Sequence, residues 1–158
     1  MEGMMSCGDW AGMVLDQNPA LQQFILIGPA EDDIRQIRTE YPDKLITFSA
    51  EEIRKGEGVE RLKQIHGGVP LYISIDKDVL DERYCETNWN QGEMPLSLLE
   101  HLLTLFLAQK NILGIDICGE CQQGIPMPEY MEAEEKNAET NRKLFEFLTR
   151  YIVTSRKK

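Results

Sequence analysis

The chain has 158 residues, of which 42% are hydrophobic and 28% are charged, and its formal net charge is −10. This length suits one compact domain with an apolar core, and the composition excludes collagen-like, low-complexity and disordered chains. The negative charge disfavours nucleic acid and anionic membrane surfaces as partners, because both are polyanions. We therefore expect a single globular domain over residues 1–158.

Neither a membrane span nor a secretory signal is predicted. The longest strongly apolar stretches, 24–27 and 102–107, are far shorter than the roughly 20 residues that cross a bilayer. The first residues contain neither the basic region nor the continuous apolar region of a signal peptide. The sequence therefore predicts a cytoplasmic protein.

The four cysteines are Cys7, Cys85, Cys118 and Cys121. A reducing compartment favours free thiols over disulfides. Cys118 and Cys121 form one close pair, but a zinc knuckle needs a second pair, and a redox motif needs a helix where this sequence predicts a loop. We expect most of these cysteines to be free thiols without a metal or redox role.

Apolar runs alternate with amphipathic stretches along the chain, which indicates a layered α/β domain with a mostly parallel sheet. Ser49 precedes Glu52 by three residues, the spacing of a capping box, and predicts the start of a helical turn. The strand at 70–75 is so uniformly apolar that we expect it to be central and buried on both faces. In chain order the predicted elements are strand 24–27, helix 31–41, strand 45–48, helix 59–66, strand 70–75, helix 95–110, strand 112–117 and helix 134–152.

Two aspartates, Asp76 and Asp78, follow the most apolar strand. Ligands bind at the carboxyl ends of strands in open parallel sheets, and residues two apart on a strand point to the same face. Carboxylates held that close repel unless a cation lies between them or one is protonated, and Mg²⁺ or Mn²⁺ prefers such oxygen ligands. The alternative is a solvated turn in which an aspartate caps the next segment.

The run from Ser74 to Asp81, Ser-Ile-Asp-Lys-Asp-Val-Leu-Asp, resembles the Ser-x-Asp-x-Asp-x-x-Asp signature of the ureohydrolase family of arginases, agmatinases and formiminoglutamases. The resemblance extends from about Phe24 onward in the order of its elements. It implies a three-layer α/β/α fold with a mostly parallel sheet, of the arginase/deacetylase type and partial in this chain. It also implies that Asp76 and Asp78 are ligands of a manganese centre of one or two ions, with Mg²⁺ or another divalent ion as an alternative.

The resemblance further implies an activity. In that family a divalent centre activates water to hydrolyse a C–N bond of a guanidino or related amide substrate. A glutamate after the last strand contacts the substrate, and its counterpart here is Glu120, one residue later than the family's Asp-x-x-Glu spacing from Asp116. We expect a small cationic substrate.

The other metal ligands of the family, a histidine and an Asp-x-His-x-Asp cluster, lie in its N-terminal half. This chain contains only His66 and His101, and neither belongs to such a cluster. We therefore expect the chain to correspond to the C-terminal half of the family fold, beginning near the segment 7–10. An exposed sheet edge left by the missing half would favour a homo-oligomer.

Two other functions are weighed against the hydrolase. The first is a non-catalytic remnant of the same fold that binds metal or oligomerises. The second is a phosphatase of the haloacid dehalogenase type, which also carries Asp-x-Asp after an apolar strand. That motif fits poorly, because here it lies in the middle of the chain and continues into Val79 and Leu80.

Overall fold

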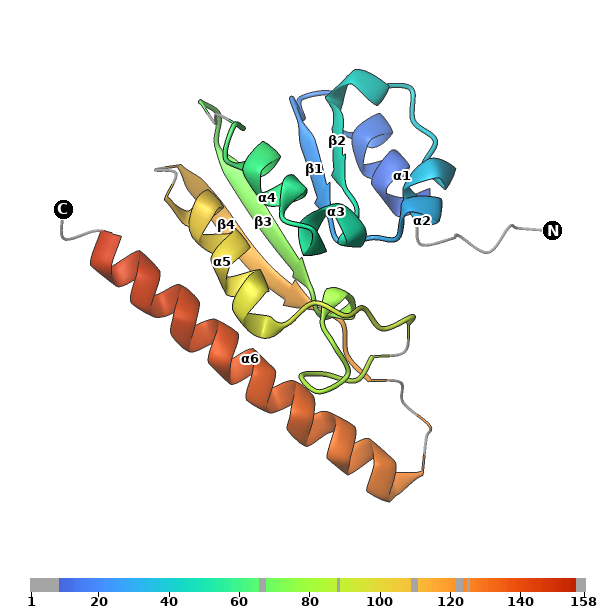
Figure 1. Ribbon diagram of the computed structural model, residues 1–158, viewed down its shortest axis with the longest axis vertical. Coiled ribbons are helices and arrows are strands. Elements are labelled where there is room, and N and C mark those ends of the chain that lie inside the picture. The colour runs from blue at the N-terminus through green and yellow to red at the C-terminus, as the bar shows by residue number, and fades with distance from the viewer. Residues whose placement is uncertain are drawn as a thin grey trace. The chain divides into compact units, whose positions relative to one another are not determined.

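The computed structural model describes residues 9–65, 68–87, 89–108, 111–121, 124 and 126–155, and it is a mixed α/β structure with short parallel strand pairs (Figure 1). The predicted α/β class is confirmed at this level. The chain divides into two compact units, Met1–Glu60 and Arg61–Lys158. Each unit is described by itself.

The first unit contains one parallel strand pair. Strand β1 pairs with β2, with Phe24 opposite Leu45 and Ile27 opposite Phe48. Both strands have the bounds that the apolar runs predict. The elements are α1 (Asp9–Gln17), β1 (Phe24–Ile27), α2 (Glu31–Gln36), a 3-10 turn (Pro42–Lys44), β2 (Leu45–Phe48), α3 (Ala50–Arg54) and α4 (Glu57–Leu62), whose last two residues belong to the second unit.

Helix α2 is shorter than predicted. It ends at Gln36, because Ile37 has an extended backbone with ψ of 127°. Beyond this point the Asp16 carboxylate of α1 accepts hydrogen bonds from the Thr39 hydroxyl (2.6 Å) and the Glu40 N–H (2.9 Å). These tertiary contacts hold the segment against α1 in place of another helical turn.

The predicted capping box at Ser49 is present. The Ser49 hydroxyl accepts a hydrogen bond from the Glu52 N–H, and the Glu52 carboxylate accepts one from the Ser49 N–H at 2.9 Å. Gly56 then adopts a φ of +83°, which L side chains rarely adopt, and separates α3 from α4. The predicted helix 59–66 is therefore Glu57–Leu62, and His66 lies outside the described residues.

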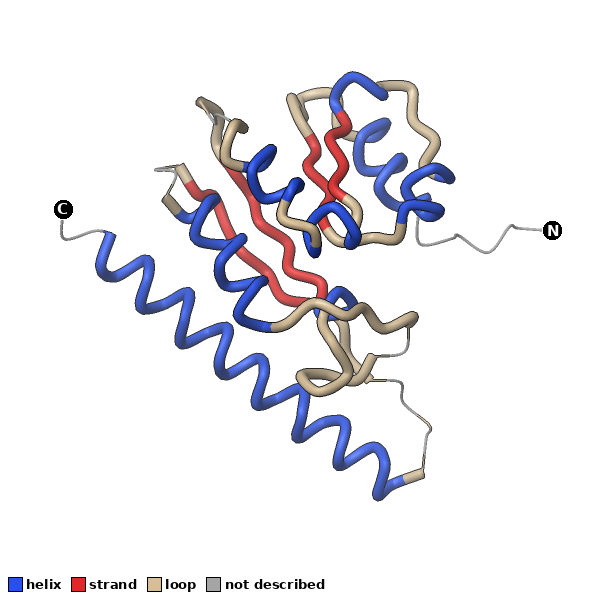
Figure 2. Tube along the Cα trace, in the orientation of Figure 1, coloured by secondary structure: helices blue, strands red, loops and turns tan. Residues whose placement is uncertain are grey.

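The second unit is built on the parallel pair of β3 (Leu71–Asp76) and β4 (Ile112–Cys118). Their register places Ser74 opposite Asp116 and Asp76 opposite Cys118. Helices α5 (Leu96–Leu107) and α6 (Met127–Ser155) contact each other on one side of this pair. Figure 2 shows the loop that leads from β3 to α5 beyond the carboxyl ends of both strands.

Helices α5 and α6 supply most of the buried apolar side chains of this unit. Helix α6 begins seven residues before the predicted start at Glu134, since Pro128 in its first turn is compatible with a helix. Among the described helices none combines the length and apolarity needed to cross a bilayer. The buried apolar residues of the two helices are Leu96, Leu99, Leu102, Leu103 and Leu107 of α5 and Ala133, Leu144 and Leu148 of α6.

Strand β3 is not buried on both faces, contrary to prediction. Ile75 is buried, whereas Tyr72 is 57% exposed. The outward side chains are polar and have partners, because the Tyr72 and Ser74 hydroxyls donate to the Asp116 carboxylate at 2.6 and 2.8 Å. Gly114 makes room for this arrangement, since a Cβ there would lie 2.9 Å from the Tyr72 ring.

The capping box yields a stability prediction. We expect Ser49→Ala to lower the free energy of unfolding by about 1 kcal/mol, because the Glu52 N–H loses its acceptor in a buried position. Urea denaturation followed by circular dichroism measures the change. Ser97→Ala on an exposed part of α5 serves as the control and should change stability by less than about 0.5 kcal/mol.

Candidate metal centre

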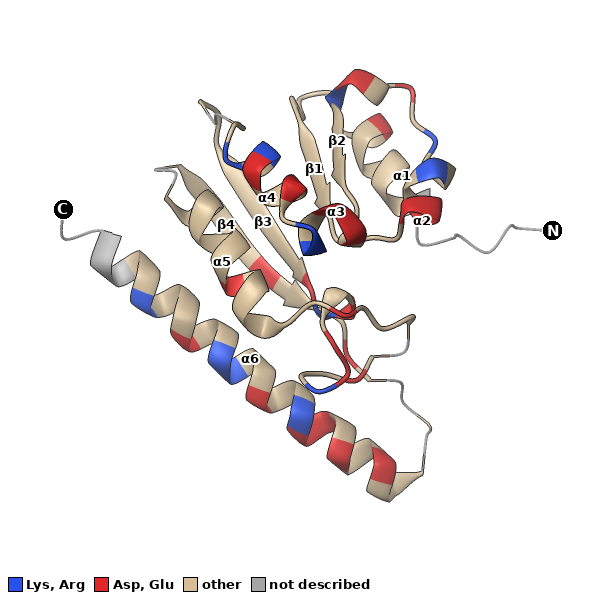
Figure 3. Ribbon diagram, viewed as in Figure 1, with Lys and Arg blue, Asp and Glu red and all other residues tan. Residues whose placement is uncertain are grey.

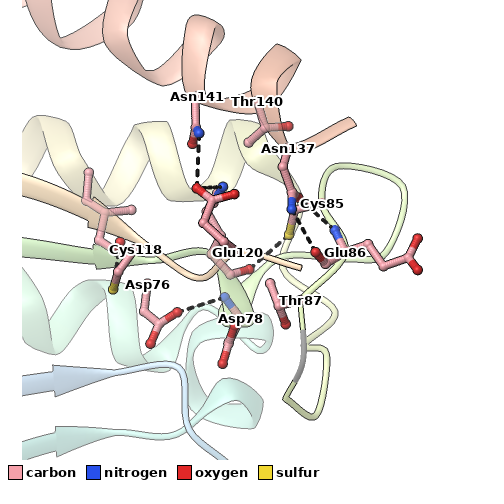
Figure 4. Close-up of polar contacts among 12 residues, drawn as sticks. Asp76, Asp78, Cys85, Glu86, Thr87, Cys118, Glu120, Asn137, Thr140 and Asn141 are labelled. Atoms are coloured by element: carbon pink, nitrogen blue, oxygen red, sulfur yellow. Dashed lines mark hydrogen bonds and ion pairs between the residues drawn. The ribbon is translucent and has the colours of Figure 1, made fainter. Parts of the chain in front are cut away.

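Asp76 and Asp78 lie together where β3 ends. Asp76 is the last residue of the strand, and a 3-10 turn over Lys77–Val79 follows at once. The Asp76 carboxylate accepts a hydrogen bond from the Asp78 N–H at 3.1 Å (Figure 4). Such a cap is what we expect if the aspartates form a solvated turn, the alternative to a metal site. It also keeps the two residues close together.

The Asp78 carboxylate has one buried oxygen. Its Oδ1 atom is inaccessible to solvent and accepts no hydrogen bond within the described ranges. Burial raises the pKa of Asp78, the nearby Thr87 hydroxyl opposes this rise, and the negative charge of Asp76 adds to it. A buried carboxylate oxygen without a donor is costly, and a cation would relieve that cost.

Gly119 makes the close approach of both carboxylates possible. Its φ is +85°, and a Cβ at this residue would lie 2.9 Å from Asp76 Oδ1 and 3.1 Å from Asp78 Oδ1. The two oxygens therefore converge on the same small space beside the Gly119 backbone. Any other residue would strain the turn and fill that space.

Lys77, between the two aspartates, extends to the opposite side of the turn. Its side chain is fully buried, and its Nζ donates to Glu120 Oε1 at 2.8 Å. The same oxygen accepts a hydrogen bond from Asn141 of α6 at 3.2 Å. Burial raises the pKa of Glu120, but the hydrogen bonds from Lys77 and Asn141 outweigh it, and the net pKa lies below its usual range.

Glu120 is therefore directed toward α6. Figure 4 shows its carboxylate near Asn141, on the other side of the turn from the carboxylate of Asp78. The structure thus brings Asp76 and Asp78 together and places the third predicted site residue in an ion pair with Lys77.

The long loop after the turn is fastened to the backbone of the site. The Gln91 side-chain amide donates to the Leu80 carbonyl at 2.6 Å, and the buried Cys85 thiol donates to the Lys77 carbonyl at 3.1 Å. The Gly92 N–H donates to the Asp78 carbonyl at 2.7 Å. These bonds hold the loop close to both aspartates.

Helix α6 fastens the same loop from outside. The Asn137 amide accepts from the Glu86 N–H at 2.9 Å and donates to the Glu86 carbonyl at 2.8 Å. The Thr140 hydroxyl donates to the Tyr84 carbonyl. Since Asn137 and Thr140 are buried, these contacts fix the loop to the helix.

Burial raises the thiol pKa of two described cysteines, Cys85 and Cys118. Cys85, Cys118 and Cys121, the cysteines within the described ranges, are free. Burial raises the pKa of Cys118, and the charges of Asp76 and Asp116 add to the rise. A thiol held protonated at neutral pH is a poor nucleophile.

The donor set suits a hard divalent ion in kind but is small. Carboxylate oxygens are the ligands that Mg²⁺ and Mn²⁺ prefer. Over the residues that the structure describes, however, no group of three or more His, Cys, Asp and Glu side chains could hold a metal ion. His101 lies on an exposed position of α5. Asp76 and Asp78 could therefore supply two ligands of a larger coordination shell.

Sequence reasoning missed Lys77 and Gly119. A lysine directly between two clustered aspartates was a usable signal, because alternate residues at a strand end point to opposite sides. Gly119 follows the strand that pairs with β3, where a close backbone approach to a ligand site often requires glycine. Nothing in the sequence indicated the roles of Asn137 and Asn141, which depend on how α6 packs.

Comparison with known proteins gives one limited match. The chain is 41% identical over 61 residues to an uncharacterized protein of Thermotoga maritima. The matched segment is 39% of this chain and 24% of the length of that relative, so the chain spans about a quarter of it. No protein-family model matches the chain. No solved structure matches it either.

The ion pair of Lys77 yields a second prediction. We expect Glu120→Gln to lower the free energy of unfolding by about 1–3 kcal/mol, because the buried ammonium loses its charged acceptor. Lys77→Met should cost less, since it removes the buried charge and keeps most of the volume. Urea denaturation ranks the variants. Equal losses for both would contradict this account.

The pKa of Asp78 yields a third prediction. A carboxyl group with a raised folded-state pKa binds its proton more tightly in the folded chain, so its ionisation lowers stability as the pH rises through its unfolded pKa. With a chelator present, Asp78→Asn should therefore be more stable than the parent protein at pH 7. The difference should shrink as the pH falls toward 4, and it should vanish only below about pH 3, where Asp78 is protonated in both states.

Asp81→Asn is the matched control for this experiment. Hydrogen bonds from Arg83 lower the pKa of Asp81, so its charge adds stability above its unfolded pKa, and that contribution is lost as the pH falls. This variant should be less stable than the parent protein at pH 7. Urea midpoints between pH 3.5 and 8 compare the two, and the same sign of change for both would refute the assignment.

Proposed function

We propose that this chain carries part of the divalent-metal centre of a ureohydrolase-type enzyme, which hydrolyses a C–N bond of a guanidino or related amide substrate. The observation that carries the proposal is the buried Asp78 oxygen beside Asp76, which accepts no hydrogen bond from the residues that the structure describes. The likeness of residues 74–81 to the family's aspartate signature supports it. The proposal includes a three-layer arginase-like fold, partial in this chain, and a cytoplasmic location.

The aspartates would hold the ion. The two carboxylates repel each other, and one of their oxygens is buried, so a divalent cation that prefers oxygen ligands would stabilise them. Our first candidate is Mn²⁺, as one or two ions, and the alternative is Mg²⁺. A bound divalent ion supplies Lewis acidity that activates water and polarises the substrate. Gly119 would leave space for the ion beside the Oδ1 atoms of Asp76 and Asp78. Lys77 would fix the turn through its ion pair with Glu120 on the opposite side.

Substrate binding would depend on charge. The chain has a net charge of −10, which attracts a small cationic guanidino compound. To contact such a substrate, Glu120 would have to turn toward the aspartate side, because its Oε1 now accepts hydrogen bonds from Lys77 and Asn141 on the other side of the turn. We propose that residues other than Asp76 and Asp78 supply the remaining metal ligands of the enzyme.

A non-catalytic metal-binding module is the second candidate. It is favoured by the small donor set, since the described ranges hold no group of three or more potential ligands. In this case Asp76 and Asp78 would bind an ion that stabilises the turn, and the chain would not turn over substrate.

Metal binding is tested by titrating Mn²⁺ into the chain with calorimetry. We expect saturable binding by the parent protein and a loss of at least tenfold in affinity for the Asp76→Ala/Asp78→Ala double variant. Asp81→Asn should bind as the parent does, since its carboxylate is held by Arg83. Undiminished binding by the double variant would remove the basis of the proposal.

Turnover separates the two candidates. Urea or amine release is measured with Mn²⁺ and a panel of guanidino and amide compounds. Hydrolysis that is lost in the double variant supports the enzyme. Binding at Asp76 and Asp78 without hydrolysis supports the non-catalytic module.

A further inference from the structure

Helix α6 carries a row of exposed apolar side chains with a spacing of seven residues: Met131, Ala138, Phe145 and Ile152. Met131 is 62% exposed, Phe145 67% and Ile152 37%. We call these four residues the outer stripe. Residues seven apart lie nearly above one another on a helix, with a drift of about 20° per repeat, so they form one line along the surface.

The outer stripe is distinct from the face that packs inside the unit. That inner face consists of Ala133, Asn137, Thr140, Leu144 and Leu148, all of them buried. At about 100° per residue the two rows point in different directions around the helix. The outer stripe is therefore not needed for the packing of α6 on its own unit, and it covers a length of about 32 Å along the axis.

The charges of α6 are separated by sign along its length (Figure 3). Residues 127–139 contain five glutamates and one lysine, which gives a net charge of −4. Residues 140–155 contain two arginines, one lysine and one glutamate, a net charge of +2. One half of the helix is thus acidic and the other half basic.

We propose that α6 pairs in antiparallel orientation with α6 of a second copy of this chain through the outer stripe. In this orientation the acidic half of each helix faces the basic half of the other. A parallel pair would place the two acidic halves side by side, which is unfavourable. The seven-residue spacing keeps one apolar side chain per two helical turns on a single line, along which two helices can pack at a small crossing angle.

The side chains of the outer stripe also match in size. When the two helices are centred between Ala138 and Phe145, each Phe145 faces the Ala138 of the other copy, and Met131 faces Ile152. Large side chains then oppose small ones at the centre, which allows close packing. Ala138 has a small side chain, so the helix surface beside Met131 and Glu135 leaves room for the phenyl ring.

Arg142 lies near the centre of such a pair, where two copies of it would approach each other. Its guanidinium is held by Glu139 at 2.7 Å and by Glu146 at 2.6 Å on its own helix. Lys143 also pairs with Glu139 at 3.3 Å, so the two cations and two glutamates form a cluster without net charge, and two such clusters can approach each other. The proposal does not depend on the metal centre, because none of these residues contacts Asp76 or Asp78.

Sedimentation velocity between 1 and 100 µM tests the pairing. We expect the parent chain to form dimers as concentration rises and Phe145→Glu to stay monomeric over this range. The control is Leu113→Glu on β4, which alters an apolar side chain that is 73% exposed but lies off the stripe, and it should dimerise as the parent does. A monomeric parent, a dimeric Phe145→Glu or a monomeric Leu113→Glu would each overturn the proposal.

Cross-linking tests the orientation and does not rely on a destabilising variant. Ala138→Cys and Phe145→Cys proteins are oxidised separately and as an equimolar mixture, and the native cysteines give the same background in all samples. An antiparallel pair predicts a disulfide-linked dimer specific to the mixture, because position 138 of one copy meets position 145 of the other. Linked dimers in the separate samples at the same level would show a parallel or nonspecific contact and reject the proposal.

Discussion

The ion pair between buried Lys77 and Glu120 is the contact on which the candidate metal centre depends. Lys77 extends to one side of the turn after β3, and the carboxylates of Asp76 and Asp78 gather on the other side. Because an ammonium group is buried only with a charged or well-bonded partner, the pair fixes which side each residue takes. Gly119 lies on the aspartate side with the conformation that this crowding requires. A cation bound to the aspartate oxygens would neutralise the negative charge on that side.

Helix α6 links this ion pair to the loop beside the aspartates. Asn141 supports Glu120, while Asn137 and Thr140 hold the loop that borders the aspartates. These polar residues occupy inner positions that a helix packed only for stability would fill with apolar side chains. Through them α6 positions the loop beside the candidate metal centre as well as covering a core. Its outer stripe points in another direction, toward the second copy of the chain that we propose.

The sequence predicted the elements that depend on interactions between residues close together in the chain. Strands β1 and β2 and the capping box at Ser49 lie where the apolar runs and the Ser-x-x-Glu spacing place them, and the aspartate pair was recognised from its position after an apolar strand. The errors occur where distant contacts decide. Helix α2 ends early because Asp16 binds the segment after it, and β3 has an exposed face because its hydroxyls bind Asp116. The partner of Lys77 could not be predicted, since it lies 43 residues away in the chain.

The parallel pairing of β3 with β4 has a consequence for the order of folding. Ser74 and Asp116 meet across a separation of 42 residues, and α5 lies in the connection between the two strands. Such a crossover closes slowly, because the chain loses the entropy of a long loop before any strand hydrogen bond forms. Asp76 therefore meets Gly119 only after this topology is complete. A metal ion held by Asp76 and Asp78 would therefore bind the folded unit and not its folding intermediates. Such binding would stabilise the folded unit and slow its unfolding.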